Sequence, residues 1–184
     1  MTCGARDRSR PLARVAWQTA LAAGLMALVL IASDGFRPDV LGMLYVACVS
    51  GELCRVDIRE HRLPNSIVLP GFAITGLGLC WQSLTTGEIP IVACVAGLAY
   101  FGFLLLLNLA GGMGAGDVKL GSLLGTALGP LGLVAAYTSP AVAFLAGGIV
   151  AALAVVTHNP GALRRIPFGP PMLFGFWAAV GLAA

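Results

Sequence analysis

The sequence contains few charged residues, which make up 10% of its 184 positions. A soluble globular domain carries roughly 25%, whereas the mean hydropathy here is +0.91. No charge occurs from Ile89 to Gly116, or between Lys119 and Arg164 when His158 is neutral. Each stretch exceeds the roughly 20 apolar residues that a membrane helix needs. The composition therefore excludes an ordinary soluble domain and predicts an all-α, polytopic membrane helix bundle of about six to seven transmembrane helices.

Patterns typical of metal and nucleic-acid binding are also missing. The five cysteines include no Cys-x-x-Cys pair, and His61 and His158 are isolated. Structural zinc sites use clustered cysteines and histidines, so we expect no metal. Cys48, Cys80 and Cys94 lie in or beside apolar stretches and are expected to be small buried hydrophobic residues. The net charge of only +3 gives no indication of a nucleic-acid partner.

Seven membrane spans fit the pattern of apolar stretches. Ser139-Pro140 is expected to separate the fifth span from the sixth, and Gly129-Pro130 to kink or end the fifth. Gly121 and Gly125, with Gly76 and Gly78, are expected to permit close helix packing. The predicted spans are approximately 15–32, 40–53, 67–82, 89–110, 118–137, 141–156 and 168–184.

The positions of the basic residues predict the orientation. With the N-terminus in the cytoplasm and alternating spans, ten of the eleven Lys and Arg side chains face the cytoplasm, and Arg37 alone lies outside. This distribution obeys the positive-inside rule. Arg6, Arg8, Arg10 and Arg14 before an apolar stretch also resemble a signal peptide, but no good small-x-small cleavage site follows, so we expect a retained first helix.

Asp117 is an acid between two long uncharged stretches. An acid at or near membrane depth is costly and by default marks a functional site. It follows Gly114 and Gly116, whose missing side chains permit unusual backbone angles and close approach of a peptide. The alternative is that Asp117 only caps the next helix. Lys119 is either an interfacial lysine or a charge that keeps nearby carboxylates ionised.

Asp57 is the second acid in comparable surroundings. With Asp117 it would form the minimal pair of an aspartic protease, and the predicted spans put both on the cytoplasmic side. Pro64 would fix the start of the third span and Asn65 would cap it. The alternative is a solvated loop in which Asp57 pairs with Arg55 and Arg59.

Three sequence blocks together resemble the type IV prepilin peptidase family of Gly-x-Gly-Asp intramembrane aspartic proteases. They occur in the family's order, from about Leu53 to the C-terminus, with leucine in place of the family's usual isoleucine before Pro-Asn. Two of the blocks match the family's catalytic aspartates at Asp57 and Asp117. The blocks are Asp57 with Arg59, Arg62 and Leu63-Pro64-Asn65, then Gly114-Ala115-Gly116-Asp117-Val118-Lys119-Leu120, then Ile166-Pro167-Phe168-Gly169-Pro170.

The resemblance implies an aspartic endopeptidase of the bacterial inner membrane, with its active site facing the cytoplasm. It would remove the short basic leader of a prepilin or pseudopilin after a glycine, at the cytoplasmic boundary of the substrate's apolar helix. Its partners would be this substrate, the lipid bilayer and the pilus assembly machinery, and it would need no cofactor. Asp57 and Asp117 would share one proton and activate water. The residues expected to support the site are Gly114, Gly116, Lys119, Pro64, Asn65, Pro167, Gly169 and Pro170. The Pro167-Gly169-Pro170 segment is expected to line the substrate path.

The resemblance also divides the chain. Residues 1–38 are expected to form a basic segment with an extra helix, and residues 39–184 the peptidase-like domain. Larger family members carry an insertion with paired Cys-x-x-Cys motifs and also methylate the product. The sequence contains no such segment and resembles the short, peptidase-only members of tight-adherence (Flp) pilus systems.

Other functions remain open from the residues alone. In a transporter or channel subunit, the two acids would bind protons or cations without sharing a water. In a non-catalytic pilus scaffold, Asp117 would be only a helix cap. A presenilin-type protease is disfavoured, because the sequence has no Pro-Ala-Leu element and no Tyr-Asp pair.

Overall fold

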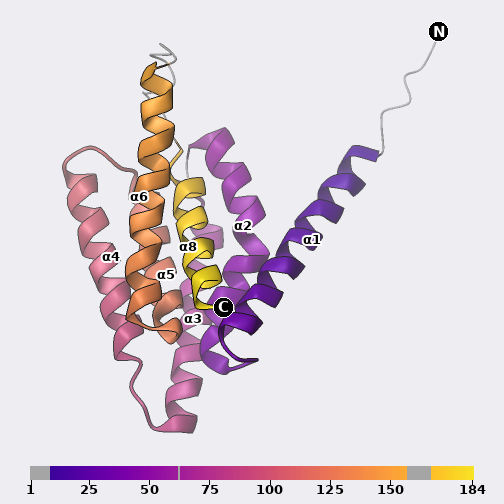
Figure 1. Ribbon diagram of the computed structural model, residues 1–184, viewed down its shortest axis with the longest axis vertical. Helices are drawn as coiled ribbons and strands as arrows, with labels where there is room; N and C mark the ends of the chain where they lie inside the picture. Colours follow the sequence, from indigo (N-terminus) through magenta and orange to yellow (C-terminus); the bar gives the residue numbers. More distant parts are fainter. Residues whose placement is uncertain (1–8, 62, 157–166) are drawn as a thin grey trace.

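The computed structural model describes residues 9–61, 63–156 and 167–184, and these form a helical bundle. Figure 1 shows the later helices side by side, with the first helix splayed away from them. The helices are α1 (Ser9–Ala32), α2 (Leu41–Glu60), α3 (Asn65–Thr86), α4 (Ile91–Leu109), α5 (Ala115–Leu128), α6 (Leu133–Val156) and α8 (Gly169–Ala183), with the short 3₁₀ turns η1 (Pro38–Val40) and η2 (Gly129–Leu131). The all-α membrane bundle predicted from composition is confirmed.

Three of the described helical segments are long and apolar enough to cross a membrane, namely α3, α4 and Leu133–Leu153 of α6. Trp17–Ala32 and α8 are shorter apolar helices. The 14 residues of α5 extend about 21 Å at 1.5 Å per residue, less than the roughly 30 Å of a bilayer core. The count of seven spans therefore stays a prediction.

The predicted break at Ser139-Pro140 is wrong, because α6 continues through both residues. The chain turns at η2, so α5 ends just before Gly129-Pro130, and the prediction for that dipeptide is confirmed. Gly132, after η2, adopts a φ of +91° that favours glycine. Proline removes one helical hydrogen bond and leaves the carbonyl four residues earlier unpaired. That carbonyl, of Ala136, accepts a hydrogen bond of 2.7 Å from the Tyr100 hydroxyl of α4, which offsets the loss.

Glycines let α4 and α5 pack closely. Gly121 and Gly125 of α5 and Gly129 at the start of η2 recur every four residues, so they lie along one side of this segment. A Cβ at Gly125 would lie 2.9 Å from the Ala96 carbonyl oxygen of α4. The expectation of close packing is confirmed for Gly121, Gly125 and Gly78, whereas a Cβ at Gly76 would meet no atom within 4 Å.

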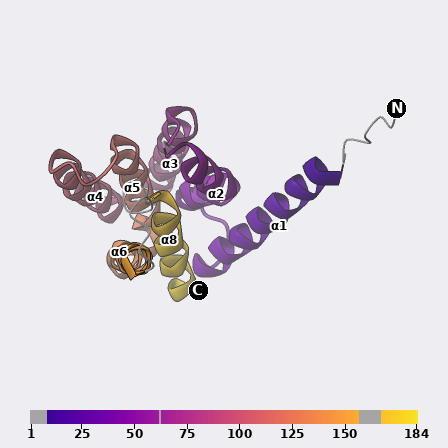
Figure 2. The same ribbon diagram turned by 90° about the horizontal axis from the view of Figure 1, so that it is seen from above.

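The most buried helices lie at the centre of the bundle. Most side chains of α5 are buried, and α8 buries Met172, Leu173, Phe176 and Val180. Figure 2 shows α5 and α8 among α2, α3, α4 and α6. Cys48, Cys80 and Cys94 are exposed, so the expectation of buried cysteines is wrong. A membrane bundle can face lipid with apolar residues, and so a hydrophobic sequence context does not predict burial within the protein.

Half of the ten basic residues expected on the cytoplasmic side lie outside the described residues, namely Arg6, Arg8, Arg62, Arg164 and Arg165. The two ends of the bundle are nevertheless distinct. Arg37 pairs with Asp39 at 3.1 Å, and its guanidinium also bonds the Pro130 carbonyl at 3.5 Å, joining η1 to η2. Asp57 and Asp117 lie at the opposite end, near the end of α2 and the start of α5.

Gly125→Ala is predicted to lower the free energy of unfolding by about 1–3 kcal/mol, the usual cost of overpacking. The added methyl group would collide with the backbone of α4, which cannot move aside by changing rotamer as a side chain can. Thermal unfolding of the purified protein in detergent measures the change.

Gly102→Ala is the matched control, because a Cβ there meets nothing within 4 Å. Alanine has a higher helix propensity than glycine, so this variant should be neutral or slightly stabilised. Equal stability of the two variants would contradict the proposed packing face.

Candidate functional site

Asp57 is buried in the last turn of α2, with 4% of its surface exposed. Its carboxylate oxygen Oδ2 accepts a hydrogen bond of 2.8 Å from the amide of Gly169, 112 residues later. Arg55 pairs with Glu52 at 2.6 Å. The alternative of a solvated loop in which Asp57 pairs with Arg55 is therefore wrong.

The sequence after Phe168 makes the Gly169 amide available to Asp57. Pro170 and Pro171 have no amide hydrogen, and the Met172 amide bonds the Phe168 carbonyl. Within the described first turn of α8, the Gly169 amide is therefore the donor left for another group. A Cβ at residue 169 would lie only 2.7 Å from Oδ2 of Asp57, so the position requires glycine.

Asp117 lies in the first turn of α5 and is partly buried. Its Oδ2 accepts a hydrogen bond of 3.3 Å from the Gly114 amide, at the residue that precedes the helix. Asp117 therefore does cap α5, as the alternative interpretation proposed. That contact uses one carboxylate oxygen, and a capping role does not exclude a chemical one.

The two acids influence each other electrostatically. Both lie beyond the apolar parts of their helices. The apolar part of α2 ends at Leu53, before Asp57, and that of α5 begins at Val118, after Asp117. Burial and then the charge of Asp57 raise the pKa of Asp117 to about 6, against a smaller opposite effect of the Gly114 amide. Burial also raises the pKa of Asp57, while the Gly169 amide and nearby His61 act in the opposite direction. Helix packing thus brings together two acids that are 60 residues apart in the sequence.

The two glycines before Asp117 act through close approach rather than unusual backbone angles. Gly114 has a φ of −76°, which other residues adopt as well. Gly116 packs against buried Leu63, and a Cβ there would lie 3.1 Å from the Leu63 Cβ. The expectation of unusual angles is therefore wrong for both residues.

Asn65 and Lys119 form a contact that the sequence did not predict. Pro64 precedes α3, and Asn65, its first residue, makes no capping hydrogen bond. Instead the Asn65 side-chain oxygen accepts a hydrogen bond of 3.1 Å from Lys119 Nζ. Lys119 is not a cause of the pKa shift of either acid, so its predicted electrostatic role is not observed. It joins the start of α3 to α5.

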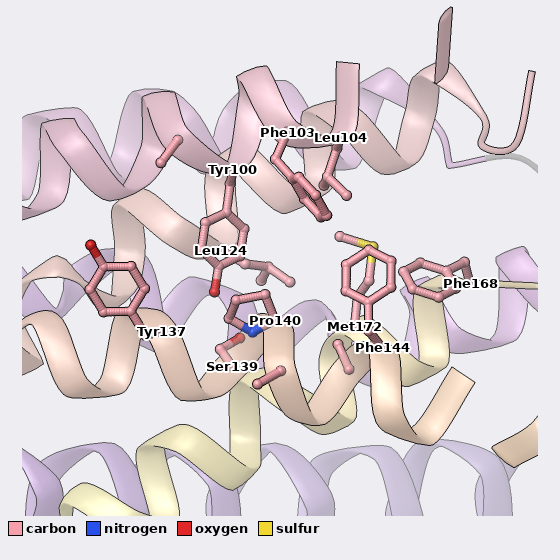
Figure 3. A pocket seen from close by; sticks show the side chains of 13 residues that line it. Tyr100, Phe103, Leu104, Leu124, Tyr137, Ser139, Pro140, Phe144, Phe168 and Met172 are labelled. Atoms are coloured by element: carbon pink, nitrogen blue, oxygen red, sulfur yellow. The ribbon is translucent and has the colours of Figure 1, made fainter. Parts of the chain in front are cut away.

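An apolar cavity of about 480 Å³ lies next to this site. Figure 3 shows Phe168, Phe144 and Met172 gathered at one end, Tyr137 at the other, and Tyr100, Ser139 and Pro140 between them. Pro167 and Phe168 precede α8 without regular secondary structure. Sequence reasoning missed the cavity, because its walls come from four helices. It also missed His61, which influences Asp57, although a spacing of four residues at a helix end places such side chains near each other.

Metal ligands are not grouped in the parts of the chain that the structure describes. No three His, Cys, Asp or Glu residues of the ranges 9–61, 63–156 and 167–184 lie together so that they could hold a metal ion. The chemistry that the site offers is that of two coupled carboxyl groups.

Comparison with known proteins explains this arrangement. The sequence pattern of the type IV leader peptidase family matches residues 43–156, which include both acids. The chain belongs to the type IV leader peptidase family.

Curated relatives agree with this assignment. The chain is 30% identical over 171 residues to the prepilin leader peptidase/N-methyltransferase of Burkholderia pseudomallei, in strains 1026b and K96243, covering 89% of this chain and 52% of the relative. It is 32% identical over 158 residues to the Bacillus subtilis protein of the same name, covering 84% and 62%. The chain thus spans about half to three fifths of the length of these relatives. No solved structure matches it.

Gly169→Ala is predicted to destabilise this family member through its contact with Asp57. The new methyl would lie against the carboxylate and lengthen the Gly169–Asp57 hydrogen bond. In an Asp57→Ala background the same change should lower the free energy of unfolding by less, because the carboxylate oxygen that the methyl group would crowd is absent. We expect a coupling energy above about 1 kcal/mol, typical of residues in direct contact.

A double-mutant cycle by thermal unfolding in detergent measures this coupling. Gly148→Ala, where a Cβ meets nothing within 4 Å, is the control and should show no coupling to Asp57. Additive effects of Gly169→Ala and Asp57→Ala would contradict the contact.

Proposed function

We propose that this protein is an intramembrane aspartic endopeptidase that removes the short basic leader from prepilin-like proteins. The observation that carries the proposal is the electrostatic coupling of Asp57 and Asp117 at one end of the bundle. The names of the curated relatives, which include prepilin leader peptidase, support the substrate class.

The different hydrogen bonds of the two acids suggest different roles. The Gly169 amide stabilises the ionised form of Asp57, so we assign Asp57 as the base that takes a proton from water. Asp117, with a pKa of about 6, carries the shared proton. Two neighbouring carboxyls with separated pKa values are the acid and base that such chemistry needs.

The proposed reaction conserves protons. The water oxygen bonds to the scissile carbonyl carbon while Asp57 takes one water proton, and Asp117 donates a hydrogen bond to the carbonyl oxygen. The carbon–nitrogen bond then breaks, and a carboxyl proton passes to the leaving amine. The products are a new carboxyl terminus and a new amino terminus, and no cofactor takes part.

The supporting residues fit this mechanism through their contacts. Gly169 holds Asp57, and Pro170 helps leave the Gly169 amide unused by the helix. Gly116 admits Leu63 against α5, while Lys119 and Asn65 fix the Pro64 segment to the same helix. We assign Gly114 to orienting the Asp117 carboxyl, and Pro167 to the entry of the substrate path.

We propose the bacterial inner membrane as the location, with the site facing the cytoplasm. The sequence distribution of basic residues supports this orientation. The substrate's basic leader would stay in the cytoplasm and its apolar segment in the bilayer, close to the pilus assembly machinery.

We also propose that residues 39–184 form the peptidase domain and residues 1–38 an addition to it. The family match begins at residue 43, and α1 packs against α2 and α8. Expressed alone, this chain should cleave without methylating, since its cysteines have no Cys-x-x-Cys spacing. This agrees with its resemblance to the tight-adherence pilus members.

Asp57→Asn and Asp117→Asn should each reduce cleavage by about a thousandfold or more, as losses within a catalytic unit do. Asparagine keeps the shape and can still accept the amide hydrogen bonds, but it can neither take nor donate the carboxyl proton. Co-expression with a candidate prepilin, followed by gel shift of the shortened product, measures cleavage.

Glu52→Gln and Glu60→Gln are the controls and should retain activity. Full processing by Asp117→Asn would reduce Asp117 to a helix cap. That outcome would remove Asp117 from the proposed mechanism.

The pH dependence should report the protonation of Asp117. Its carboxyl is protonated below its pKa of about 6, so kcat/KM should fall as the pH rises above about 6, approaching tenfold per pH unit. The pH dependence of kcat/KM reports the pKa of Asp117 in the free enzyme, whereas that of kcat reports its pKa in the complex with substrate. If bound substrate excludes water from the site, burial raises that pKa further, so kcat should fall at a higher pH than kcat/KM.

Cleavage rates from about pH 5 to 8 with purified protein test this profile. Circular dichroism over the same range controls for unfolding. A kcat/KM that stays constant above about pH 6 would contradict a proton-donating Asp117.

A further inference from the structure

The apolar cavity lies between two closely packed helix pairs. α4 packs extensively on α5, and α6 on α8, whereas α4 and α6 contact each other little. The pairs are joined near Pro140 by the Tyr100 hydroxyl, which donates to the Ala136 carbonyl at 2.7 Å. The cavity of about 480 Å³ therefore lies along a weakly packed boundary within the bundle.

The walls of the cavity fit an apolar occupant. They include Phe103, Leu104, Leu124, Phe144, Phe168 and Met172. The Tyr100 hydroxyl is already engaged by Ala136, and Ser139 is buried. An occupant with polar groups would leave them without partners, which is costly.

One end of the cavity lies one residue from the amide that binds Asp57. Phe168 forms part of the wall, and the next residue, Gly169, donates its amide to Asp57. Met172, at the end of the same helical turn, is also in the wall. In Figure 3 Phe168 and Met172 lie at one end and Tyr137 at the far end. Because Phe168 directly precedes the residue that binds Asp57, the Phe168 end of the cavity is the end near Asp57.

We propose that this cavity receives apolar side chains of the substrate's membrane helix that follow the cleaved bond. The proposal rests on the proposed function and adds a binding site to it. The volume lies within the roughly 300–1,000 Å³ of pockets that hold one small ligand. The cavity therefore accommodates a few side chains from one face of the substrate helix, while the rest of that helix faces lipid. The competing occupant is a lipid acyl chain.

Filling the cavity tests its role in substrate binding. Ala141 of α6 lines the cavity and is exposed, so Ala141→Phe should occupy part of it. Ala152→Phe changes another exposed alanine of the same helix that does not line the cavity. Each variant is assayed with two substrates. The helical substrate has a basic leader, a glycine and an apolar helix of about 20 residues. The second substrate is a soluble peptide that ends a few residues after the same cleavage site.

Ala141→Phe should raise KM about tenfold for the helical substrate, because excluding one apolar side chain costs about that factor or more. Its kcat for the helical substrate should match that of the unmodified protein. Its kinetics with the soluble peptide should also be unchanged. Ala152→Phe should have unchanged kinetics with both substrates. Unchanged KM for the helical substrate would overturn the cavity assignment. An equal loss with both substrates would also overturn it, because the effect would then be on the catalytic site.

Photocrosslinking gives an independent test that does not depend on how Ala141→Phe folds. A benzoylphenylalanine replaces Phe144, in the cavity wall, in the Asp117→Asn background, which should bind the substrate without cutting it. The same replacement of Phe174, which is 61% exposed and does not line the cavity, is the control.

The expected result is an adduct between position 144 and the apolar helix of the substrate, and little such adduct from position 174. Adducts with lipid alone at position 144 would assign the cavity to an acyl chain and overturn the proposal. Failure of the unmodified protein to cleave either substrate would instead refute the proposed function. Cleavage with unchanged Ala141→Phe kinetics would refute the cavity assignment alone.

Discussion

The hydrogen bond from the Gly169 amide to the Asp57 carboxylate is the contact on which the site depends. It joins the end of α2 to the start of α8 and gives a hydrogen-bond donor to an acid that is only 4% exposed. A buried carboxylate without such partners is expensive, so this contact determines which helices can meet at this end of the bundle. The glycine leaves room for the oxygen, and the two prolines after it leave the amide unused by the helix.

The packing of α5 positions Asp117, the second acid of the site. Asp117 begins a helix of only 14 residues that is buried on most sides, and its glycines permit the close approach of α4. The acid is thereby held where burial and the charge of Asp57 act on it together. The contacts of Leu63 with Gly116 and of Lys119 with Asn65 anchor the start of α3 to the same helix. The two acids are therefore positioned by contacts among five helices, namely α2, α3, α4, α5 and α8.

Close packing within the helix pairs α4–α5 and α6–α8 contrasts with the sparse contact between them. A proline inside α6 leaves the Ala136 carbonyl for Tyr100, so the same hydrogen bond preserves the helix and links the two pairs. The apolar cavity beside this link begins one residue from the amide that binds Asp57. The hydrogen bond to Asp57 and a space for apolar side chains are thus adjacent, which is the arrangement that the proposed function requires.

The sequence by itself determined the membrane class, most of the helices and the two acids. Low charge content predicts spans through the cost of burying charge, and an acid next to an uncharged stretch stands out for the same reason. Tertiary structure decided what local patterns do not contain. Asn65 bonds Lys119 rather than capping α3, and α6 continues through Pro140 because a hydroxyl from another helix replaces the missing bond. The partner of Asp57 is a backbone amide 112 residues away. Such contacts depend on which helix faces meet, and neither hydropathy nor local propensity specifies that choice.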